Sequence, residues 1–499
     1  MVRLPLTLLA ALALSFGAGV WSEEPAAAAP AAAAAPAEAP AAEKPKTVEE
    51  RLAAVEAQAK LAADSTNQVA FNAGDNAWML TSTLLVLLMT LPGLALFYGG
   101  LVRAKNVLGT MMQSIAIAGV ISVLWCIIGY SLAFGGDGKV LGDASFAMLN
   151  GVVWKDGAMF GAPNGDYAMS IPHGTFMLFQ LMFAIITPAL ICGAYAERMK
   201  FSAMLVMNVA WFFVVYIPLA HMVWGKGGLF NWGFGAKDWA AFDFAGGTVV
   251  HISSGIAALV CAIILGKRKI SDTEPMRPHS LVLSFIGACL LWVGWFGFNA
   301  GSALGAGGLA TLAFSNTHFA TAAAALTWPL AEWLIRGKPT VLGAISGAVA
   351  GLVAITPAAG FVAPGAALII GAVAGFLCFA SSSYLKSALK YDDALDAFGV
   401  HGVGGIWGAI ATGIFFQADA NPGLVALNKD LYDSIKAGAH PVVLNQIKAV
   451  LFTVLFSGIA TTVILLVVKY TIGLRVTAEE ESEGLDLTQH GEEGYHKLT

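Results

Sequence analysis

The sequence predicts an all-α membrane protein, and three observations carry that prediction. Of the 499 residues, 57% are hydrophobic and 12% are charged, about half the ~25% charged fraction of soluble domains. The mean hydropathy is +0.72, and long apolar runs recur along most of the chain. One soluble core cannot bury so many apolar runs, which excludes a soluble enzyme. The net charge of −5, without any block of basic residues, excludes a nucleic-acid-binding protein.

The first 70 residues are predicted to lie outside the membrane domain. Residues 1–22 carry Arg3, an apolar stretch and then small residues, which is typical of a signal peptide. Residues 23–70 combine an Ala/Pro-rich linker with a short helical stretch at 47–63. Apolar residues recur there at alternating steps of four and three, as in a heptad seam. This stretch is interpreted either as a solvated helix or as a self-association helix.

Residues 71–472 are predicted to form a domain of eleven transmembrane helices in contact with lipid. A helix needs about 20 residues at 1.5 Å each to cross about 30 Å of hydrocarbon. The eighth and tenth windows are rich in Gly and Ala, which suits helices inside a bundle. The predicted windows are 77–97, 109–134, 173–195, 202–224, 247–266, 280–299, 309–335, 341–358, 364–384, 401–418 and 447–468.

Basic residues orient these windows. One set of alternate connections, with the start of the tail, holds 14 Lys and Arg residues, and the opposite connections hold 6. By the positive-inside rule the first set is cytoplasmic, so the N-terminus is outside and the C-terminus inside. A cleaved signal peptide requires the same orientation. We therefore expect a multi-pass membrane protein with this orientation.

Eleven spans predict two five-helix halves and one extra helix, with the second half inverted relative to the first. Two short segments support that interpretation. The run from Asp243 to His251 opens the fifth span, and the run from Asp396 to His401 opens the tenth. Each holds an aspartate, then glycine, then a histidine at the membrane.

Ionisable residues inside spans are costly and indicate function by default. His251 and His401 lie beside small residues, and burial favours the neutral imidazole. The pair is interpreted either as a contact for a small polar solute or a proton, or as two histidines each satisfied by a backbone carbonyl. His221 is expected at the membrane interface, and His318 in a hydrogen bond between helices. No cofactor and no metal site are predicted.

Asp243 is expected to be an N-cap and also to place a negative charge near the outer side. Trp224, Phe179, Phe183 and Phe298 lie near the predicted outer helix ends. Most membrane Trp and Phe residues are packing or belt residues, but a ring face also attracts a cation. The pattern therefore hints at an aromatic site for a small cation.

Six runs resemble the ammonium transporter/methylammonium permease/Rhesus family, and in particular its bacterial ammonium transporter branch. They follow the family's order from about residue 77 to the C-terminus. The runs are Phe97-Tyr-Gly-Gly-Leu-Val-Arg103, Ala196-Glu-Arg198, Ala220-His-Met-Val-Trp224, Asp243 to His251, Gly294-Trp-Phe-Gly-Phe-Asn-Ala-Gly-Ser302 and Phe398-Gly-Val-His-Gly402.

The resemblance implies a homotrimer of eleven-helix protomers, each with its own pore for ammonium or methylammonium. It implies an outer recruitment site made by Trp224, Phe179 and Ser302. Below that site it implies a gate of stacked Phe rings, and then twin histidines. These correspond to Phe183 with Phe298 and to His251 with His401, while Asp243 corresponds to the family's structural aspartate.

Residues 473–499 are predicted to be a cytoplasmic regulatory tail. By composition this acidic segment is solvated and would be described only as disordered. The resemblance adds that such tails couple the protomers and receive a PII-type signalling protein, which is therefore the expected partner.

The leading hypothesis is ammonium uptake, with deprotonation before ammonia crosses a hydrophobic pore. An ammonium sensor with little flux that signals by binding PII is the alternative. A carbon dioxide channel is a third interpretation, against which the Trp224 and Ser302 site argues.

Overall fold

The computed structural model describes residues 71–155, 158–234, 237–269 and 277–495. The described residues belong to one compact unit, Thr66–Thr499. The expected signal peptide at 1–22, and the linker and short helix at 23–70, lie outside the described residues.

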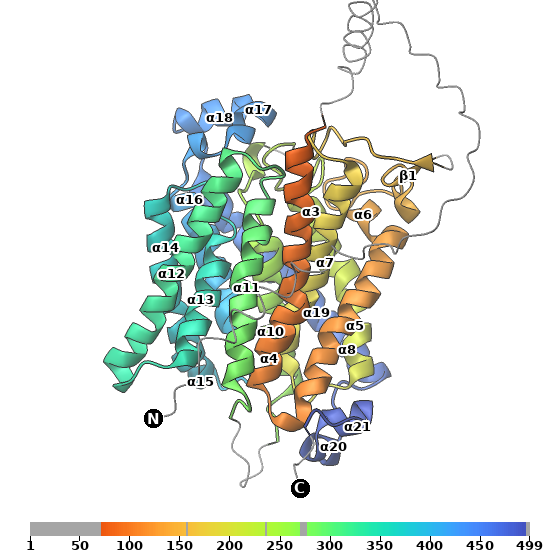
Figure 1. Cartoon of the computed structure of the whole chain (residues 1–499), viewed down its shortest axis with the longest axis vertical. Coiled ribbons are helices and arrows are strands. Elements are labelled where there is room, and N and C mark those ends of the chain that lie inside the picture. The colour runs from red at the N-terminus through yellow and green to blue at the C-terminus, as the bar shows by residue number, and fades with distance from the viewer. Residues whose placement is uncertain (1–70, 156–157, 235–236, 270–276, 496–499) are drawn as a thin grey trace, which may run out of the picture. The chain divides into compact units, whose positions relative to one another are not determined.

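The described chain is almost entirely helical, and each of the eleven predicted windows coincides with a helix (Figure 1). The α-helices are α3 (Ala73–Leu88), α4 (Ala95–Leu101), α5 (Val107–Leu124), α6 (Tyr130–Phe134), α7 (His173–Tyr195), α8 (Phe201–Trp211), α9 (Ile217–Trp224), α10 (Ser253–Leu265), α11 (Leu281–Gly301), α12 (Gly308–Arg336), α13 (Val341–Ile355), α14 (Pro364–Ala380), α15 (Lys386–Leu389), α16 (Val403–Ile414), α17 (Pro422–Leu427), α18 (Lys429–Lys436), α19 (Val442–Thr471), α20 (Ala478–Glu483) and α21 (Leu485–His490).

Turns of π-helix extend several of these helices into longer segments. They are Met89–Leu94, Trp125–Gly129, Phe212–Tyr216, Gly247–Ile252, Ser381–Leu385 and Phe398–Gly402. Short 3₁₀ turns occur at Ala104–Asn106, Ala147–Leu149, Lys237–Trp239 and Ala418–Ala420. Strands β1 (Trp154–Lys155) and β2 (Ala158–Met159) form a small antiparallel ribbon.

Within the described residues, eight helical segments are long and apolar enough to cross a membrane, so the protein is a helical membrane protein. The predicted eighth and tenth windows are the shorter apolar helices Val341–Ile355 and Phe398–Ile414. The predicted seventh window is α12, which is 29 residues long. The count of eleven spans and the orientation of the termini stay predictions.

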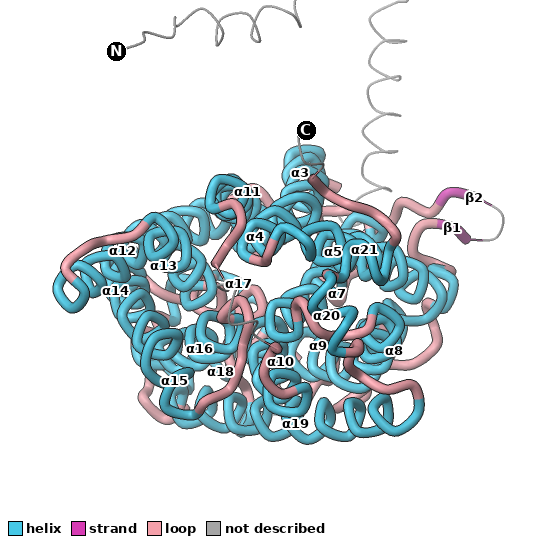
Figure 2. The backbone as a smooth tube through the Cα atoms, turned by 90° about the horizontal axis from the view of Figure 1, so that it is seen from below, coloured by secondary structure: helices cyan, strands magenta, loops and turns pink. Residues whose placement is uncertain are grey.

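The helices run side by side in a bundle, with α17 and α18 at one end and α15, α20 and α21 at the other (Figure 1). Viewed end-on, α12, α13 and α14 group at one edge of the bundle (Figure 2). A Cβ at Gly347 or Gly351 would lie 2.6 Å from a backbone oxygen of α12. The predicted small-residue ridge on α13 therefore permits the close packing of α13 on α12.

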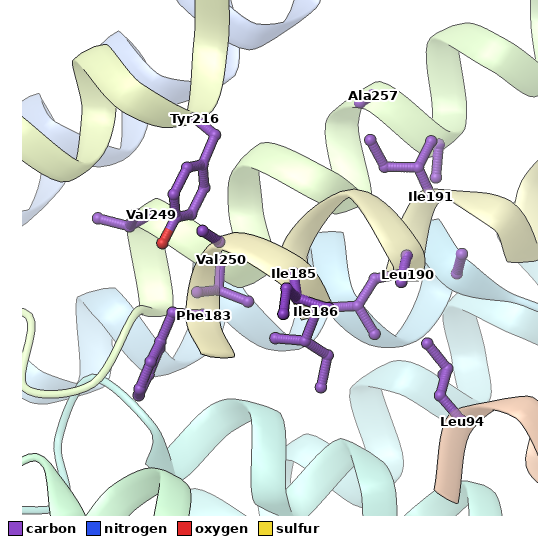
Figure 3. Packing of buried hydrophobic residues seen from close by; sticks show 14 of the residues in the cluster. Leu94, Phe183, Ile185, Ile186, Leu190, Ile191, Tyr216, Val249, Val250 and Ala257 are labelled. Atoms are coloured by element: carbon purple, nitrogen blue, oxygen red, sulfur yellow. The ribbon is translucent and has the colours of Figure 1, made fainter. Parts of the chain in front are cut away.

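The core is centred on α7, nearly all of whose residues are buried. Figure 3 shows Phe183, Ile186 and Leu190 along α7, with Val250 and Leu94 in the same cluster. Because three of these side chains (Ile186, Leu190 and Leu94) also line a cavity described below, the core and the candidate pore share walls.

Candidate functional site

A pocket of about 350 Å³ opens at the α17 end of the bundle, and we call it the Trp224 pocket. Aromatic side chains form about a third of its lining, and the rest is a mixture of aliphatic and polar residues. Phe183, Trp224, Ser302 and Asp243 are all among the lining residues. The structure thus brings four of the eight predicted site residues to one pocket.

Phe179 does not line this pocket, although it was predicted to share the recruitment site with Trp224 and Ser302. Its ring is fully buried behind Phe183, with the ring centroids 5.0 Å apart. Phe183 takes that place instead, 5.8 Å from the Trp224 ring. The two phenylalanines are one turn apart on the same side of α7, and Phe183 is the one that lines the pocket.

Phe183 also packs against Phe298 from α11, with ring centroids 4.4 Å apart. The two rings come from different helices and meet at the floor of the Trp224 pocket. The two rings predicted to form the gate are therefore in contact, and their role as a gate stays a prediction.

Asp243 caps the π-helical turn Gly247–Ile252, as the sequence predicts. Its Oδ1 accepts from the backbone N–H of Gly246 at 2.8 Å and of Gly247 at 2.6 Å. Its Oδ2 accepts from the Thr248 N–H at 2.7 Å and from the Thr248 hydroxyl. Both carboxylate oxygens accept hydrogen bonds from the first residues of the helix. Asp243 therefore fixes the position of this part of the pocket wall.

His251 and His401 contact one another directly, with their Nδ1 atoms 3.3 Å apart. This is the paired arrangement, and it replaces the alternative of two histidines that each bond a backbone carbonyl. Gly255 and Gly405 each follow their histidine by four residues, and each packs against the π-helical turn that carries the other histidine. A Cβ at Gly255 would lie 2.2 Å from the Gly402 nitrogen, so glycine is required for this approach.

The histidine pair continues the aromatic series. The His251 ring lies 5.9 Å from Phe298 and 5.4 Å from Trp295, nearly parallel to both. Its Nε2 lies 3.3 Å from the Thr356 hydroxyl. Sequence reasoning missed Thr356, which follows the last residue of α13 and carries no motif.

A small cavity of about 10 Å³ lies between the Phe pair and the histidines, lined by Phe298, His251 and His401 among others. A third cavity, of about 350 Å³, lies at the α15 end, and we call it the Arg268 pocket. His401, Phe97 and Val349 line both the small cavity and the Arg268 pocket. The Phe183–Phe298 contact connects the wall of the Trp224 pocket to that of the small cavity, and the shared residues connect the small cavity to the Arg268 pocket.

Two other histidines lie outside the pair. His221 is fully buried near the end of α9, with its ring nitrogens 2.9 Å from Ala133 O and 2.6 Å from Gly138 O, and its place at the membrane interface stays a prediction. These carbonyls belong to the α6 end and the loop after it, which fold over the ring. His318 is exposed and contacts the Trp292 ring at 5.6 Å. It makes no hydrogen bond to a described residue, because it faces outward from α12.

The segment that leads to His401 is capped by Asp393, which lies three residues before the run that the sequence analysis singled out. Asp393 accepts from the N–H of Ala397 at 3.1 Å and of Phe398 at 2.7 Å. Asp396 instead has a positive φ of 59° and binds Lys386 Nζ at 2.6 Å. Asp393 precedes His401 by eight residues, just as Asp243 precedes His251. This equal spacing could have identified Asp393 as the cap from the sequence.

A buried ion cluster adjoins the Arg268 pocket, and sequence reasoning assigned it no role. Glu197 binds Arg103 at 2.9 Å and Arg268 at 2.8 Å, and Arg268 also binds Asp392 at 2.8 Å. Burial alone would raise the pKa of Glu197, but the two arginines hold it below its usual value. The pKa of Asp392 falls to about 2 because its bonds to Arg268 outweigh its burial. Both carboxylates are therefore charged at neutral pH.

The tail is ordered through residue 495, in contrast to the disordered segment that its composition indicated. Asp486 accepts from the N–H of Leu108 at 3.0 Å and of Gly109 at 2.7 Å, and so caps α5. The Leu485 N–H donates to Asn106, whose amide also binds Glu197. Acidic residues of the tail accept hydrogen bonds from the N–H groups at helix starts and form ion pairs with basic side chains. Composition alone does not reveal these contacts.

Comparisons with known proteins agree with this geometry. Residues 77–495 match the model of the Ammonium Transporter Family. An ammonium transporter of Bacillus subtilis is 50% identical over 85% of this chain and 98% of its own. One of Aquifex aeolicus is 47% identical over 86% of this chain and 95% of its own.

Solved structures give the same result. The crystal structure of Saccharomyces cerevisiae Mep2 aligns with a TM-score of 0.73 at 33% identity, over 86% of this chain and 93% of that one. A structure titled as a sensor Amt protein aligns with a TM-score of 0.70 at 26% identity, over 84% of this chain and 98% of that one. The chain belongs to the ammonium transporter family.

Proposed function

We propose that this protein carries ammonium nitrogen across a bacterial inner membrane through the three cavities in series. The observation that supports this most is that each cavity is linked to the next by side chains that are in contact or that line both. Phe183 forms the floor of the Trp224 pocket, Phe298 borders the small cavity, and His401 lines both the small cavity and the Arg268 pocket. With the orientation that the basic residues predict, the Trp224 pocket faces outward.

The Trp224 pocket suits recruitment of ammonium or methylammonium. The faces of Phe183 and Trp224 attract a cation, an effect worth about 2 kcal/mol or more when the cation is desolvated. The Ser302 hydroxyl donates to Phe298 O at 2.8 Å, so its oxygen keeps lone pairs that can accept an ammonium N–H. The Asp243 carboxylate holds this wall in place and adds a negative field.

The charge is lost before the narrow part is crossed. The space beyond the Phe pair is about 10 Å³, too small for a hydrated ion. A bare cation there would lose its hydration without an anionic partner, which is very costly, whereas neutral ammonia is tolerated. Ammonium therefore gives up a proton near the Phe pair or the histidines, and ammonia passes His251 and His401.

The partners proposed for this chain are two further copies of itself, in a homotrimer, and a PII-type protein. The tail supports the second, because it docks at the same end of the bundle as the Arg268 pocket. A protein that binds there can reach both the tail and the mouth of the path.

The test is the current of purified protein in liposomes after an ammonium jump. We expect a current in the wild type that is lost in the double variant His251→Ala, His401→Ala. It should persist in His318→Ala, which removes an exposed histidine that lines none of the three cavities. No wild-type current, together with ammonium-dependent binding of PII, would contradict transport and favour a sensor.

A further inference from the structure

Thr356 joins three polar groups next to the histidine pair. This fully buried residue follows α13. Its Oγ1 lies 2.9 Å from the indole Nε1 of Trp295 and 2.8 Å from the carbonyl oxygen of Leu352. The third neighbour is the Nε2 of His251, at 3.3 Å.

The chemistry of the first two groups fixes the direction of each hydrogen bond. An indole N–H only donates and a carbonyl only accepts, whereas a hydroxyl has one hydrogen and two acceptor sites. The Thr356 hydrogen therefore goes to Leu352 O, and one acceptor site goes to Trp295. The remaining acceptor site faces His251, so the Nε2 of His251 must carry its proton.

A neutral imidazole with a proton on Nε2 has a bare Nδ1. The Nδ1 atoms of His251 and His401 are 3.3 Å apart and form one hydrogen bond, which needs one hydrogen. That hydrogen has to lie on His401 Nδ1, which leaves His401 Nε2 bare. His401 Nε2 is also the one nitrogen of the pair without a hydrogen-bond partner among the described residues.

We propose that Thr356 is a positioning residue that sets which nitrogen of each pore histidine is protonated. The opposite pattern would require its hydroxyl to leave Leu352 O at 2.8 Å for His251 at 3.3 Å. That exchange gives up the shorter bond and leaves Leu352 O without the hydroxyl.

The consequence for transport rests on the proposed function. The pair presents one proton-accepting nitrogen, His401 Nε2, on the residue that lines both the small cavity and the Arg268 pocket. When ammonium transfers a proton there, one of its N–H bonds breaks and ammonia remains. The His401 imidazolium that forms can then pass its Nδ1 proton to the bare Nδ1 of His251, so each proton is accounted for.

The direct test is nitrogen NMR of the full chain in lipid, with ¹⁵N-labelled histidine and the two pore residues assigned through their backbone neighbours. Protonated and bare ring nitrogens have well-separated shifts. We expect the proton on Nε2 in His251 and on Nδ1 in His401, in both the wild type and Thr356→Ser. A wild-type spectrum with the reverse pattern would overturn the inference, and it needs no variant to fold.

Thr356→Val tests the same point by removing the hydroxyl at nearly constant shape. We expect mixed protonation of the histidines and an ammonium current lower by about 3- to 10-fold, the effect of one lost hydrogen bond. Thr356→Ser keeps the hydroxyl and should show the wild-type protonation of the histidines and the wild-type current. Thr412→Val is the matched control, because Thr412 is equally buried and bonds only Gly408 O, at 2.8 Å.

Failure of the inference is distinguishable from failure of the proposed function. If the wild type carries no ammonium current but shows the expected protonation, transport is contradicted and the role of Thr356 stands. If current is present and Thr356→Val leaves the histidine spectrum unchanged, the role of Thr356 is contradicted and transport stands.

Discussion

In the segment from Asp243 to His251, the capping carboxylate is surrounded by backbone N–H groups and one hydroxyl. In the segment from Asp393 to His401, the capping carboxylate accepts two backbone N–H groups and lies beside other ionised side chains. Both place the aspartate eight residues before the histidine. Both also have positive φ three residues after the aspartate, at Gly246 and Asp396.

The two segments enter the path from opposite ends. Asp243 lines the Trp224 pocket, and Asp396 and Ala397 line the Arg268 pocket. One backbone design is thus used twice, in opposite directions, to bring two imidazoles together. The two ends differ in their charged side chains. The Lys226–Asp166 pair at the Trp224 pocket is solvated, whereas the Glu197 ion cluster at the Arg268 pocket is buried.

The largest expected effect tests that difference in charge. Glu197→Gln removes a buried charge that pairs with Arg103 and Arg268, and should lower the free energy of unfolding by about 4 kcal/mol. Asp166→Asn breaks the Lys226 ion pair at the rim of the Trp224 pocket, where the partners are 42% and 43% exposed. It should cost less than about 1 kcal/mol. Denaturation in detergent measures the free energy of unfolding of both variants. Equal losses would contradict the difference that we infer between the two ends.

The second prediction concerns pH. Burial, with the charge of Asp396 beside it, raises the pKa of Asp393 to about 6. The folded protein therefore holds a proton that the unfolded chain releases, and stability is lost as pH rises from about 4 to about 6, by up to about 3 kcal/mol. Asp393→Asn cannot titrate and should lack this loss. Melting temperatures from pH 4 to 7 check it, and parallel curves for the two proteins would count against it.

The third prediction compares the caps. Asp243→Ala leaves several buried N–H groups without acceptors and should cost about 2 kcal/mol. Asp393→Ala should cost less than about 1 kcal/mol at neutral pH, because relief of its buried charge offsets the loss of two bonds. Denaturation of the two variants at pH 7 gives the order, and a larger loss at Asp393 would reverse our interpretation.

The fourth prediction concerns Thr248, whose hydroxyl donates to Asp243. The equivalent position in the second segment is Phe398, which has no hydroxyl. Thr248→Val keeps the side-chain shape and should cost about 1 kcal/mol, the net value of one hydrogen bond. Thr471→Val is a control for an exposed threonine hydroxyl that bonds its own helix. The same denaturation measurement should separate them.

Much of this arrangement could be predicted from the sequence. Windows of apolar residues located each long helix, because spanning hydrocarbon demands length and hydropathy that few other structures need. Two costly residues in corresponding spans singled out His251 and His401, but the sequence left open whether the two rings contact one another. The meeting of Phe183 and Phe298 followed from the family resemblance, and the structure places these rings together.

The remaining features depended on three-dimensional contacts. Phe179 and Phe183 lie one turn apart, and only packing shows which of them faces the pocket. Asp393 and Asp396 are both acidic residues before His401, and their backbone conformations separate cap from ion pair. The acidic tail is solvated by composition, yet Asp486 finds the N–H groups of α5 from more than 370 residues away.

The most direct test of the central claim is a comparison of ammonium-evoked currents in liposomes for His251→Ala, His401→Ala and the double variant. If the joined imidazoles act as one unit, each single variant should lose about 100-fold, as much as the double variant loses. Single losses that multiply in the double variant, or a wild-type current in either single variant, would contradict the account.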